Sequence, residues 1–256
     1  MLKVEIYVIN MESSLSRRDS ISKQFKELDL PFHFFKAVNG NSDCHSLFDK
    51  YNSKKRLLLR GKPLVNGQLG CFASHYLLWE KCVDEGRPMI ILEDDACIEQ
   101  ELFLSFYNAA ISINDKYECI RLFKNKSKNN RYSIESNLTH DMSVAKFTKG
   151  HMSTTGYYIT PSAAKQFLRE AHQWVFPVDI YMDRFWSNKV ECYGLVPPCV
   201  GNDEVFDSDI NYAKNTKRYS FKVKITRELF AFSESIRRAI WNSEYSIQRF
   251  LKKYKA

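Results

Sequence analysis

The chain has 256 residues, of which 44% are hydrophobic and 27% charged, and its formal net charge is +8. This composition is typical of a soluble globular protein with a real core, built as one large domain or two small ones. The absence of any apolar window near 18 residues argues against a membrane span, and the first residues lack the long apolar segment of a secretory signal. Seven scattered cysteines without a C-x-x-C pair argue against a zinc knuckle or a disulfide scaffold, and fit thiols in a reducing cytosol.

The positive charge is concentrated at the carboxyl end. Residues 214–256 hold twelve Lys/Arg against three Asp/Glu, so residues 1–213 are close to neutral. We therefore divide the chain into a main domain, residues 1–213, and a basic carboxyl-terminal segment, residues 214–256. Such a segment can hold an anionic surface although the main domain is not basic.

The first forty residues predict a strand–helix–strand unit. The β-branched run VEIYVIN, residues 4–10, is typical of a strand, and residues 13–28 carry apolar side chains at helical spacing. The run FHFFKAV, residues 32–38, predicts a second strand that the Asn39-Gly40 turn closes. Such a unit implies parallel strands joined by a right-handed crossover.

The next part of the chain continues this alternation. Residues 41–66 are polar and basic and predict a surface excursion. A helix is expected over residues 66–86, followed by a strand over residues 88–95. A second helix over residues 102–113 and a strand over residues 117–123 then follow.

The last part of the main domain predicts further strands around one helix. Residues 124–137 have the composition of a loop, and the runs SVAKFT (143–148) and TGYYIT (155–160) predict two paired strands. Residues 161–172 predict a helix with a proline in its first turn, and residues 190–200 a final strand. The overall alternation predicts an α/β fold with a Rossmann-like sheet.

Three adjacent acids, Glu93, Asp94 and Asp95, directly follow a buried aliphatic run. Ligands bind beyond the carboxyl ends of parallel strands, so we expect these acids to border a cleft. Crowded carboxylates repel one another unless a cation lies among them. Oxygen ligands suit Mg²⁺ or Mn²⁺, which would neutralise and orient a leaving diphosphate. A solvated acidic turn is the alternative.

Four sequence blocks stand in one order between residues 4 and 205. They are VINMESSLSRR (8–18), FFKAVNG (34–40), GQLGCFASHYLLWEK (67–81) with IILEDDACI (90–98), and TTGYYIT (154–160) with FPVDIYMD (176–183). On these blocks the sequence resembles glycosyltransferase family 25, the lipooligosaccharide-type sugar transferases. The resemblance implies a GT-A-like fold, with a mixed Rossmann-type sheet flanked by helices, and a nucleotide-sugar donor that is usually UDP-galactose.

Three residues near the first strand are expected to meet the nucleotide. Asn10 ends the strand and is expected to hydrogen-bond a base or a ribose. Arg17 or Arg18 is expected to contact the base or the diphosphate. A solvated helix face is the alternative for both arginines.

The start of the helix over residues 66–86 is a second candidate contact with the donor. Gly67 and Gly70 would allow close backbone approach, and free N–H groups at a helix start bind anions or sugar hydroxyls. Ser74 and His75 lie one turn further along. For His75, the alternative is a buried core histidine.

By resemblance, the acids divide their work. Asp95 is expected to bind the metal ion, with Glu93 or Asp94 assisting it or contacting ribose or sugar. Thr155 and Gly156, together with the preceding threonine, would line the cleft near a sugar. The two tyrosines that follow are expected either to stack on a sugar face or to belong to the strand core.

Inversion at the anomeric centre needs a carboxylate that takes the proton of the acceptor hydroxyl. Asp179 and Asp183 are four residues apart, and so share one face of a helix that begins near Pro177. Asp179 matches the family's Pro-x-Asp pattern, and a helix N-cap is its alternative role. His151 and Asp203 are weaker candidates, as a second metal ligand.

The basic segment predicts an amphipathic helix from Glu228 onward. Its apolar residues recur at three- and four-residue steps, and its other face is rich in Lys and Arg. Such helices lie on anionic membranes or acidic partners, and docking on the main domain is the alternative. We therefore expect a cytoplasmic protein that lies peripherally on the inner face of a bacterial inner membrane. We expect no nucleic-acid partner, because no recognised binding motif is present.

Together these features predict an inverting, UDP-galactose-dependent β-galactosyltransferase that acts on a lipooligosaccharide or lipopolysaccharide acceptor, assisted by Mn²⁺ or Mg²⁺. Use of another UDP-hexose, such as UDP-glucose, is one alternative. The others are a non-catalytic protein that binds nucleotide sugars or glycans and a metal-dependent phosphohydrolase on a Rossmann-like sheet.

Overall fold

The computed structural model describes residues 4–113, 116–127, 130–191, 193–202 and 221–253. The strands are β1 (Glu5–Asn10), β2 (His33–Lys36), β3 (Met89–Glu93), β4 (Ala96–Ile98), β5 (Cys119–Arg121), β6 (Tyr132–Asn137), β7 (Ser143–Phe147), β8 (Gly156–Ile159), β9 (Tyr193–Val196) and β10 (Val200–Asn202). The α-helices are α1 (Leu15–Leu28), α2 (Ser53–Arg60), α3 (Asn66–Glu85), α4 (Gln100–Ala110), α5 (Pro161–Glu170), α6 (Val178–Met182), α7 (Phe185–Asn188) and α8 (Phe221–Lys253), and η1 (Ser46–Lys50) is a 3₁₀ helix.

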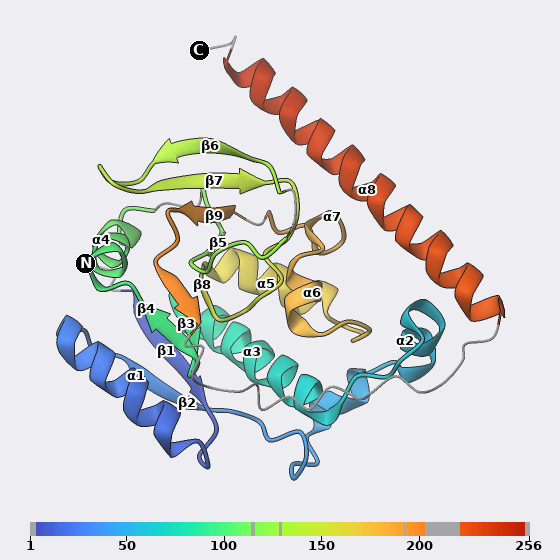
Figure 1. Ribbon diagram of the computed structural model, residues 1–256, viewed down its shortest axis with the longest axis horizontal. Helices are drawn as coiled ribbons and strands as arrows, with labels where there is room; N and C mark the ends of the chain where they lie inside the picture. Colours follow the sequence, from blue (N-terminus) through green and yellow to red (C-terminus); the bar gives the residue numbers. More distant parts are fainter. Residues whose placement is uncertain (1–3, 114–115, 128–129, 192, 203–220, 254–256) are drawn as a thin grey trace.

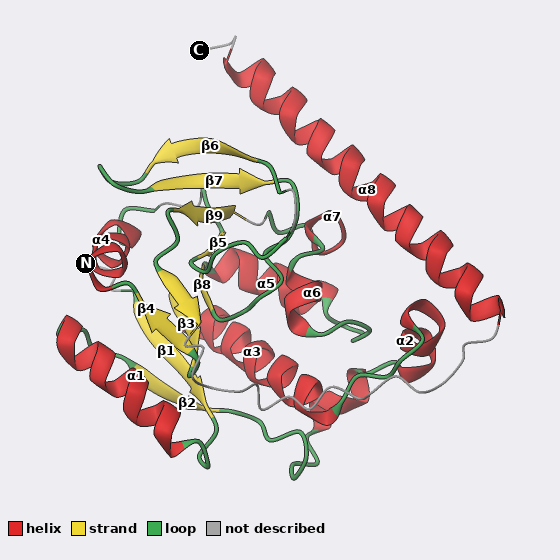
Figure 2. Cartoon of the chain, viewed as in Figure 1, coloured by secondary structure: helices red, strands yellow, loops and turns green. Residues whose placement is uncertain are grey.

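An eight-stranded mixed sheet in the order β2-β1-β3-β8-β5-β9-β7-β6 forms the centre of the protein (Figure 1). Strand β1 runs parallel to both β2 and β3, whereas β8 is antiparallel to its two neighbours, β3 and β5. Helices cover both faces of the sheet (Figure 2). One core cluster packs α1 and α4 on alternate side chains of β1 and β3, and the other packs α3 and α5 on the opposite face. The predicted α/β fold with a mixed Rossmann-type sheet is confirmed.

Three local predictions are wrong. The runs at 143–148 and 155–160 do not pair with each other, because β7 lies between β6 and β9 while β8 inserts between β3 and β5. The polar excursion after β2 contains two helices, η1 and α2, and the loop composition over 124–137 conceals strand β6. Strand β6 lies at the edge of the sheet, and its residues largely alternate between exposed and partly buried. Polar side chains there meet water.

The carboxyl-terminal helix α8 docks on the main domain through one face. It spans Phe221–Lys253, starting earlier than the periodicity predicts, and the expected domain boundary at residues 213 and 214 lies outside the described residues. Glu234 accepts two hydrogen bonds from Arg184, and the Nε1 of Trp241 donates to Glu191 at 2.8 Å. Docking on the main domain, one of the two sequence alternatives, is therefore observed. Because docking occupies only one side of the helix, contact of the other side with a membrane or an acidic partner stays a prediction.

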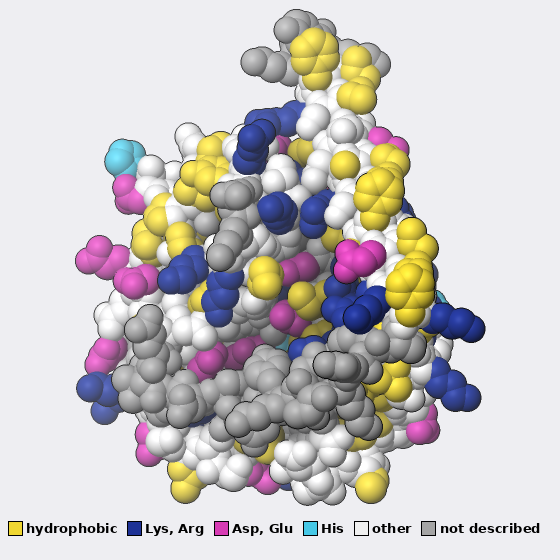
Figure 3. Space-filling model, turned by 45° about the vertical axis from the view of Figure 1, so that its right-hand side comes forward, with side chains coloured by type: hydrophobic (Ala, Val, Ile, Leu, Met, Phe, Trp, Pro, Cys, Tyr) yellow, Lys and Arg dark blue, Asp and Glu magenta, His cyan; other side chains and the backbone are white. Residues whose placement is uncertain are grey.

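The other side of α8 exposes a continuous row of large apolar side chains, which we call the α8 stripe. Figure 3 shows hydrophobic side chains along this helix. Its members are between 43% and 67% exposed: Ile225, Leu229, Phe232, Ile236, Ile240, Ile247 and Leu251. In the part of the chain that the structure describes, no helix combines the length and hydrophobicity that crossing a membrane requires.

Candidate functional site

A cavity of about 350 Å³ opens beyond the carboxyl ends of β1 and β3, and we call it the strand-end cavity. Parallel strands place their carboxyl ends at one edge of the sheet, which is why residues far apart in sequence meet here. The start of α1, the loop after β2 and the first turns of α3 close the other sides. The lining residues include Ile9, Met11, Ser14, Arg17, Asn39, Gly40, Gly67, Cys71, Ser74, His75, Glu93, Asp94 and Asp95.

Two glycines let the loop after β2 lie directly on α3. A Cβ atom on Gly40 would lie 1.8 Å from the carbonyl oxygen of Asn66, and one on Gly70 would lie 2.4 Å from that of Val38. The Oγ of Ser74 accepts from the backbone N–H of Val38 at 2.9 Å. Gly70 and Ser74 thus shape the wall of the cavity, and the close backbone approach that we expected at Gly70 is made by the protein itself.

Asp94 is held by two side chains from the first strand–helix unit. The Nδ2 of Asn10 donates to Asp94 Oδ2 at 2.7 Å, and Arg17 donates to Asp94 Oδ1 at 3.1 Å. Arg18 in turn donates to Asn10 Oδ1 at 3.3 Å and stacks on the ring of Phe34. Arg17 lines the strand-end cavity. Asn10 and Arg18 do not line it and lie behind the residues that do.

Glu93 ends a buried hydrogen-bond chain whose direction follows from the donors. Trp79 Nε1 can only donate, and it lies 2.9 Å from the hydroxyl of Tyr157. Because the Glu93 carboxylate can only accept, Nε2 of a neutral His75 carries the ring proton, and Nδ1 accepts from the Tyr157 hydroxyl 2.9 Å away. Nε2 then donates to Glu93 Oε1 at 3.2 Å, and the hydroxyl of Thr154 donates to the same oxygen.

This arrangement keeps Glu93 ionised. Burial opposes the charged form, but the hydrogen bonds from His75 and Thr154 hold the pKa of Glu93 below its usual value. The ring of His75 is fully buried, as its core alternative predicts. It also lines the strand-end cavity, where we expected the donor contacts.

Asp95 presents the oxygen atoms best suited to a hard cation. Its Oδ1 is buried and has no hydrogen-bond partner among the described residues, and the same holds for Oδ1 of Asn202. The two side chains are in contact, since Asn202 Nδ2 donates to Asp95 Oδ2 at 3.2 Å. Burial, with the nearby charge of Glu93, raises the pKa of Asp95 to about 6. Two unpaired oxygens in a buried position fit Mg²⁺ or Mn²⁺.

A second group of possible ligands, Cys71, His75 and Glu93, brings three donor atoms within 4.8 Å of one another. The hydrogen bonds argue against a metal ion there. Coordination by Nε2 of His75 would force its proton onto Nδ1, which already accepts from Tyr157. Burial and three neighbouring carboxylates also raise the pKa of the Cys71 thiol well above its usual value, which opposes the thiolate that a metal needs.

The two aspartates of α6 and its end differ in their surroundings. Both oxygens of Asp183 accept hydrogen bonds, from Arg121 and from the backbone N–H groups of His151 and Met152. Asp179 is partly exposed in the first turn of α6, whose N-cap is Pro177. Burial raises the pKa of Asp179, the backbone N–H of Ile180 opposes this, and the charge of Glu93 adds to it.

Several other predicted residues lie behind the residues that line the strand-end cavity and contact them or the strand core. Thr155 accepts from the backbone N–H of Glu93 at 2.9 Å through its carbonyl oxygen, and Gly156 packs under Leu92. Tyr157 and Tyr158 are at most 1% exposed, so their strand-core alternative is the observed one. None of these four residues lines the strand-end cavity.

The two weaker metal candidates have different outcomes. His151 is buried against the ring of Phe147, away from the strand-end cavity, and burial, with the charges of Arg121 and Lys146, lowers its pKa well below the usual value. Asp203 lies outside the described residues. The neighbouring Asn202 was not predicted, and only the antiparallel pairing of β10 with β4 brings it to Asp95.

Comparisons with known proteins identify the family to which the chain is related. Residues 3–182 match the sequence model described as "Glycosyltransferase family 25 (LPS biosynthesis protein)". The chain is 30% identical to "Lipooligosaccharide biosynthesis protein lic2B" of Haemophilus influenzae, covering 80% of this chain and 78% of that one. It is 25% identical to "Lacto-N-neotetraose biosynthesis glycosyltransferase LgtB" of Neisseria gonorrhoeae, covering 81% and 75%.

A eukaryotic relative matches over a smaller part of its own length. "Procollagen galactosyltransferase 1" of Danio rerio is 25% identical, and the match covers 70% of this chain and 30% of that one. Because the family match spans residues 3–182, every residue that lines the strand-end cavity falls inside it, whereas Asn202 lies beyond it. The chain belongs to glycosyltransferase family 25 and is a glycosyltransferase.

Proposed function

We propose that this glycosyltransferase moves a hexose, with galactose as the expected sugar, from its UDP donor to a hydroxyl of a lipooligosaccharide or lipopolysaccharide, with inversion and with Mg²⁺ or Mn²⁺. The names of the bacterial and eukaryotic relatives support lipooligosaccharide as acceptor and galactose as the sugar. The strand-end cavity supports a nucleotide diphosphate, because Arg17 lines it beside the acids that end β3.

The observation that carries the metal-assisted part is that Asp95 Oδ1 and Asn202 Oδ1, on two side chains in contact with each other, are buried and have no hydrogen-bond partner among the described residues. These two residues would hold the cation, and Glu93, which we also expected to bind it, would assist through its oxygen that is not bonded to His75 and Thr154. When bound, the ion supplies positive charge that stabilises the leaving diphosphate.

The protein's own residues perform the remaining steps of the proposed reaction. Arg17, kept in place by Asp94, offers a second positive charge to the diphosphate. Asp179 takes the proton of the acceptor hydroxyl as that oxygen bonds to C1 of the sugar and UDP leaves. Its raised pKa makes it a stronger base than an ordinary carboxylate, and its partial exposure lets an acceptor reach it.

The central experiment measures UDP release from UDP-galactose, UDP-glucose and UDP-N-acetylhexosamines, with and without Mn²⁺ and acceptor. Turnover with one UDP-hexose that requires Mn²⁺ is expected. No UDP release from any donor would instead indicate a binding protein, and release of inorganic phosphate without acceptor would indicate a phosphohydrolase. Either result would contradict the proposal.

Variants at the cation site sharpen this experiment. In Asp95→Asn and Asn202→Ala we expect weaker Mn²⁺ binding by calorimetry and the loss of the strengthening effect of Mn²⁺ on UDP binding. Asp19→Asn, which removes an exposed carboxylate on α1, is the matched control. Unchanged Mn²⁺ affinity in Asp95→Asn would refute its ligand role.

Asp179→Asn tests the proposed base. Transfer should fall by at least about a hundredfold, the usual contribution of general base catalysis, while UDP affinity stays at the wild-type value. Loss of folding, seen as a lower melting temperature, would point instead to a structural role in the first turn of α6.

We further propose that the protein lies on the inner face of the inner membrane through the α8 stripe. An exposed apolar row of this length, on a helix with lysines and arginines beside it, is the pattern of an interfacial helix. Phe232→Gln with Ile236→Gln should reduce co-sedimentation with anionic vesicles, whereas Ser233→Gln, exposed but outside the stripe, should not. Equal co-sedimentation of all three proteins would sink this proposal.

A further inference from the structure

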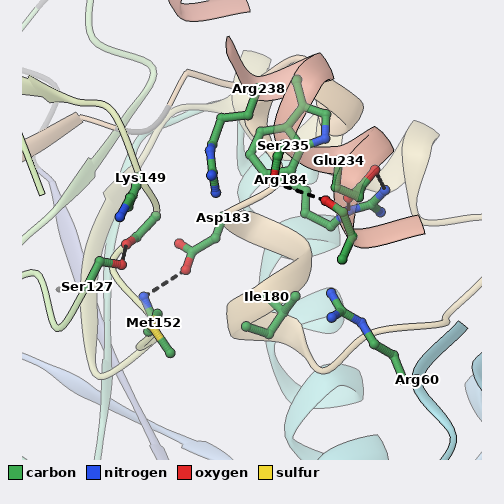
Figure 4. Close-up of a pocket in the computed structure, with 13 residues that line it drawn as sticks. Arg60, Ser127, Lys149, Met152, Ile180, Asp183, Arg184, Glu234, Ser235 and Arg238 are labelled. Atoms are coloured by element: carbon green, nitrogen blue, oxygen red, sulfur yellow. Dashed lines mark hydrogen bonds and ion pairs between the residues drawn. The ribbon is translucent and has the colours of Figure 1, made fainter. Parts of the chain in front are cut away.

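A second cavity of about 430 Å³ lies between α8 and the main domain, and we call it the α8 cavity. Figure 4 shows Lys149 and Met152 on one side, Glu234, Ser235 and Arg238 descending from α8, and Arg60 on the side opposite Lys149. The short helix α6 forms its floor through Ile180 and Asp183. Figure 3 shows Lys and Arg side chains gathered beside α8, over this hollow part of the surface.

The charges around the α8 cavity do not balance. Among the residues that the structure describes, the lining carries four cationic side chains, Arg60, Lys149, Arg184 and Arg238, and two carboxylates. Both carboxylates already have strong partners: Glu234 binds Arg184 through two hydrogen bonds, and Asp183 binds Arg121 behind the wall. Arg60 and Arg238, which pair with neither carboxylate, therefore bring positive charge to the cavity.

Two of these arginines are held by aromatic rings rather than by acids. The guanidinium of Arg60 lies 5.2 Å from the ring of Phe176 and 5.5 Å from that of Phe230, and Arg238 lies 5.7 Å from the ring of Trp186. In the described part of the chain, no carboxylate lies within ion-pair distance of Arg60 or Arg238. Stacking leaves the edge N–H groups of a guanidinium available to a ligand.

Holding these cations together is unfavourable without an anion. Arg60 is half-buried, and burial lowers its pKa; the charge of Glu234 opposes this shift, and the charges of Arg184 and Arg227 add to it. A cavity that gathers positive charge against this penalty fits a ligand with fixed negative charge. Guanidinium groups bind phosphate and carboxylate oxygens through paired, charge-assisted hydrogen bonds.

The α8 cavity adjoins the place where transfer would occur. Asp179, on α6, is close enough to Glu93 in the strand-end cavity for that carboxylate to influence its pKa. One short segment completes the connection, since Thr154 bonds Glu93 while Met152, two residues earlier, lines the α8 cavity. Asp179 itself lines neither cavity, but the next residue, Ile180, lines the α8 cavity.

We propose that the α8 cavity is an acceptor subsite that binds an oxyanion, a phosphate or a carboxylate, carried on the acceptor glycan. The inference rests on the proposed function, because it takes the strand-end cavity as the donor site. Arg238 and Arg60 grip the oxyanion from α8 and α2, and this places a hydroxyl of the acceptor sugar against Asp179. The acceptor class is thus an acidic glycan rather than a neutral one.

Calorimetric titration tests this binding directly. Glucose 6-phosphate, glucuronate and glucose are titrated separately into the full chain in the presence of saturating UDP and Mn²⁺, which keep the sugar phosphate out of the strand-end cavity. We expect at least one charged sugar to bind at least about tenfold more tightly than glucose, the value of one charge-assisted hydrogen bond. The tighter of the two charged sugars identifies the oxyanion as phosphate or carboxylate.

Substitutions on α8 distinguish a specific binding site in the α8 cavity from general electrostatic attraction of the charged sugar to this basic helix. Arg238→Gln should weaken the charged sugar about tenfold and leave glucose unchanged, and Arg238→Lys, which keeps the charge but loses the paired donors, should weaken it less. Lys224→Gln removes the same charge from an exposed position on α8 outside the cavity and should have no effect. Melting temperatures of all variants establish that they are folded.

Each failure has a distinct signature. Equal binding of glucose and both charged sugars by the wild type, equal binding of the charged sugar by wild type and Arg238→Gln, or an equal loss in Lys224→Gln would overturn the acceptor subsite. These binding results are independent of the UDP-release assay, which tests the proposed transferase function separately. Conversely, the absence of UDP release from every donor would sink the proposed transferase function while leaving the charged-sugar affinities as measured.

Discussion

The hydrogen-bond chain behind Glu93 makes a quantitative prediction for Tyr157→Phe. The substitution removes one hydroxyl and keeps the ring in its buried place. Two fully buried nitrogen atoms then lose their partner, the Nε1 of Trp79 and the Nδ1 of His75, each 2.9 Å from that hydroxyl. An unsatisfied buried polar group costs about 1–3 kcal/mol, so we expect a loss of about 3 kcal/mol in the free energy of unfolding.

The neighbouring Tyr158 supplies a matched control. Its side chain lies on the other face of the sheet, and its hydroxyl makes a longer bond, at 3.3 Å, to the carbonyl oxygen of Ile113. Urea denaturation of Tyr158→Phe should therefore give a loss of about 1 kcal/mol. If Tyr157→Phe is no less stable than Tyr158→Phe, the chain of donors does not hold. Nitrogen NMR shifts give a second check, since His75 of the wild type should carry its proton on Nε2.

Three further outcomes are expected. Asp183→Ala takes the carboxylate away from the buried guanidinium of Arg121 and should cost about 3–5 kcal/mol in urea denaturation, with part of this loss recovered when Arg121→Met is added. Burial raises the pKa of Asp183 from 3.8 to about 6, so the folded protein binds a proton that the unfolded chain has released. The unfolding free energy of the wild type should therefore fall relative to Asp183→Asn as pH rises between these two values. Gly40→Ala forces a Cβ into the carbonyl oxygen of Asn66 and should lower both melting temperature and UDP affinity, whereas Gly201→Ala meets nothing nearer than 3.8 Å and should keep its stability.

The amino-terminal half of the fold was predictable because its signals are local. β1, α1 and β2 follow from periodicity within windows of a few residues, and α3 and β3 from one continuous pattern. The strand-end cavity could be placed from the same information. Once β1 and β3 are parallel, Arg17, His75 and the acids after β3 must meet at one edge.

Pairing between distant strands was not predictable in the same way. The runs that form β7 and β8 are close in sequence, which favours a hairpin, but all four residues of β8 are buried and its edges pair with β3 and β5. A strand buried in this way needs helices over both faces, which only the whole fold supplies. The same argument applies to Asn202, whose place beside Asp95 depends on β10 pairing with β4.

The amphipathic pattern of α8 does not predict which side of the helix packs on the main domain. Periodicity predicts that one side is apolar, and the simplest packing would turn that side inward. The structure instead docks α8 through Glu234, Trp241 and Asn242, whose hydrogen bonds reach Arg184, Glu191 and the carbonyl oxygen of Thr148, and leaves the α8 stripe outside. Exposed apolar area on this scale is unfavourable in water unless another surface covers it. Because the docked side also carries Arg238 into the α8 cavity, one helix would connect the surface on which an acceptor lies to the cavity that receives it.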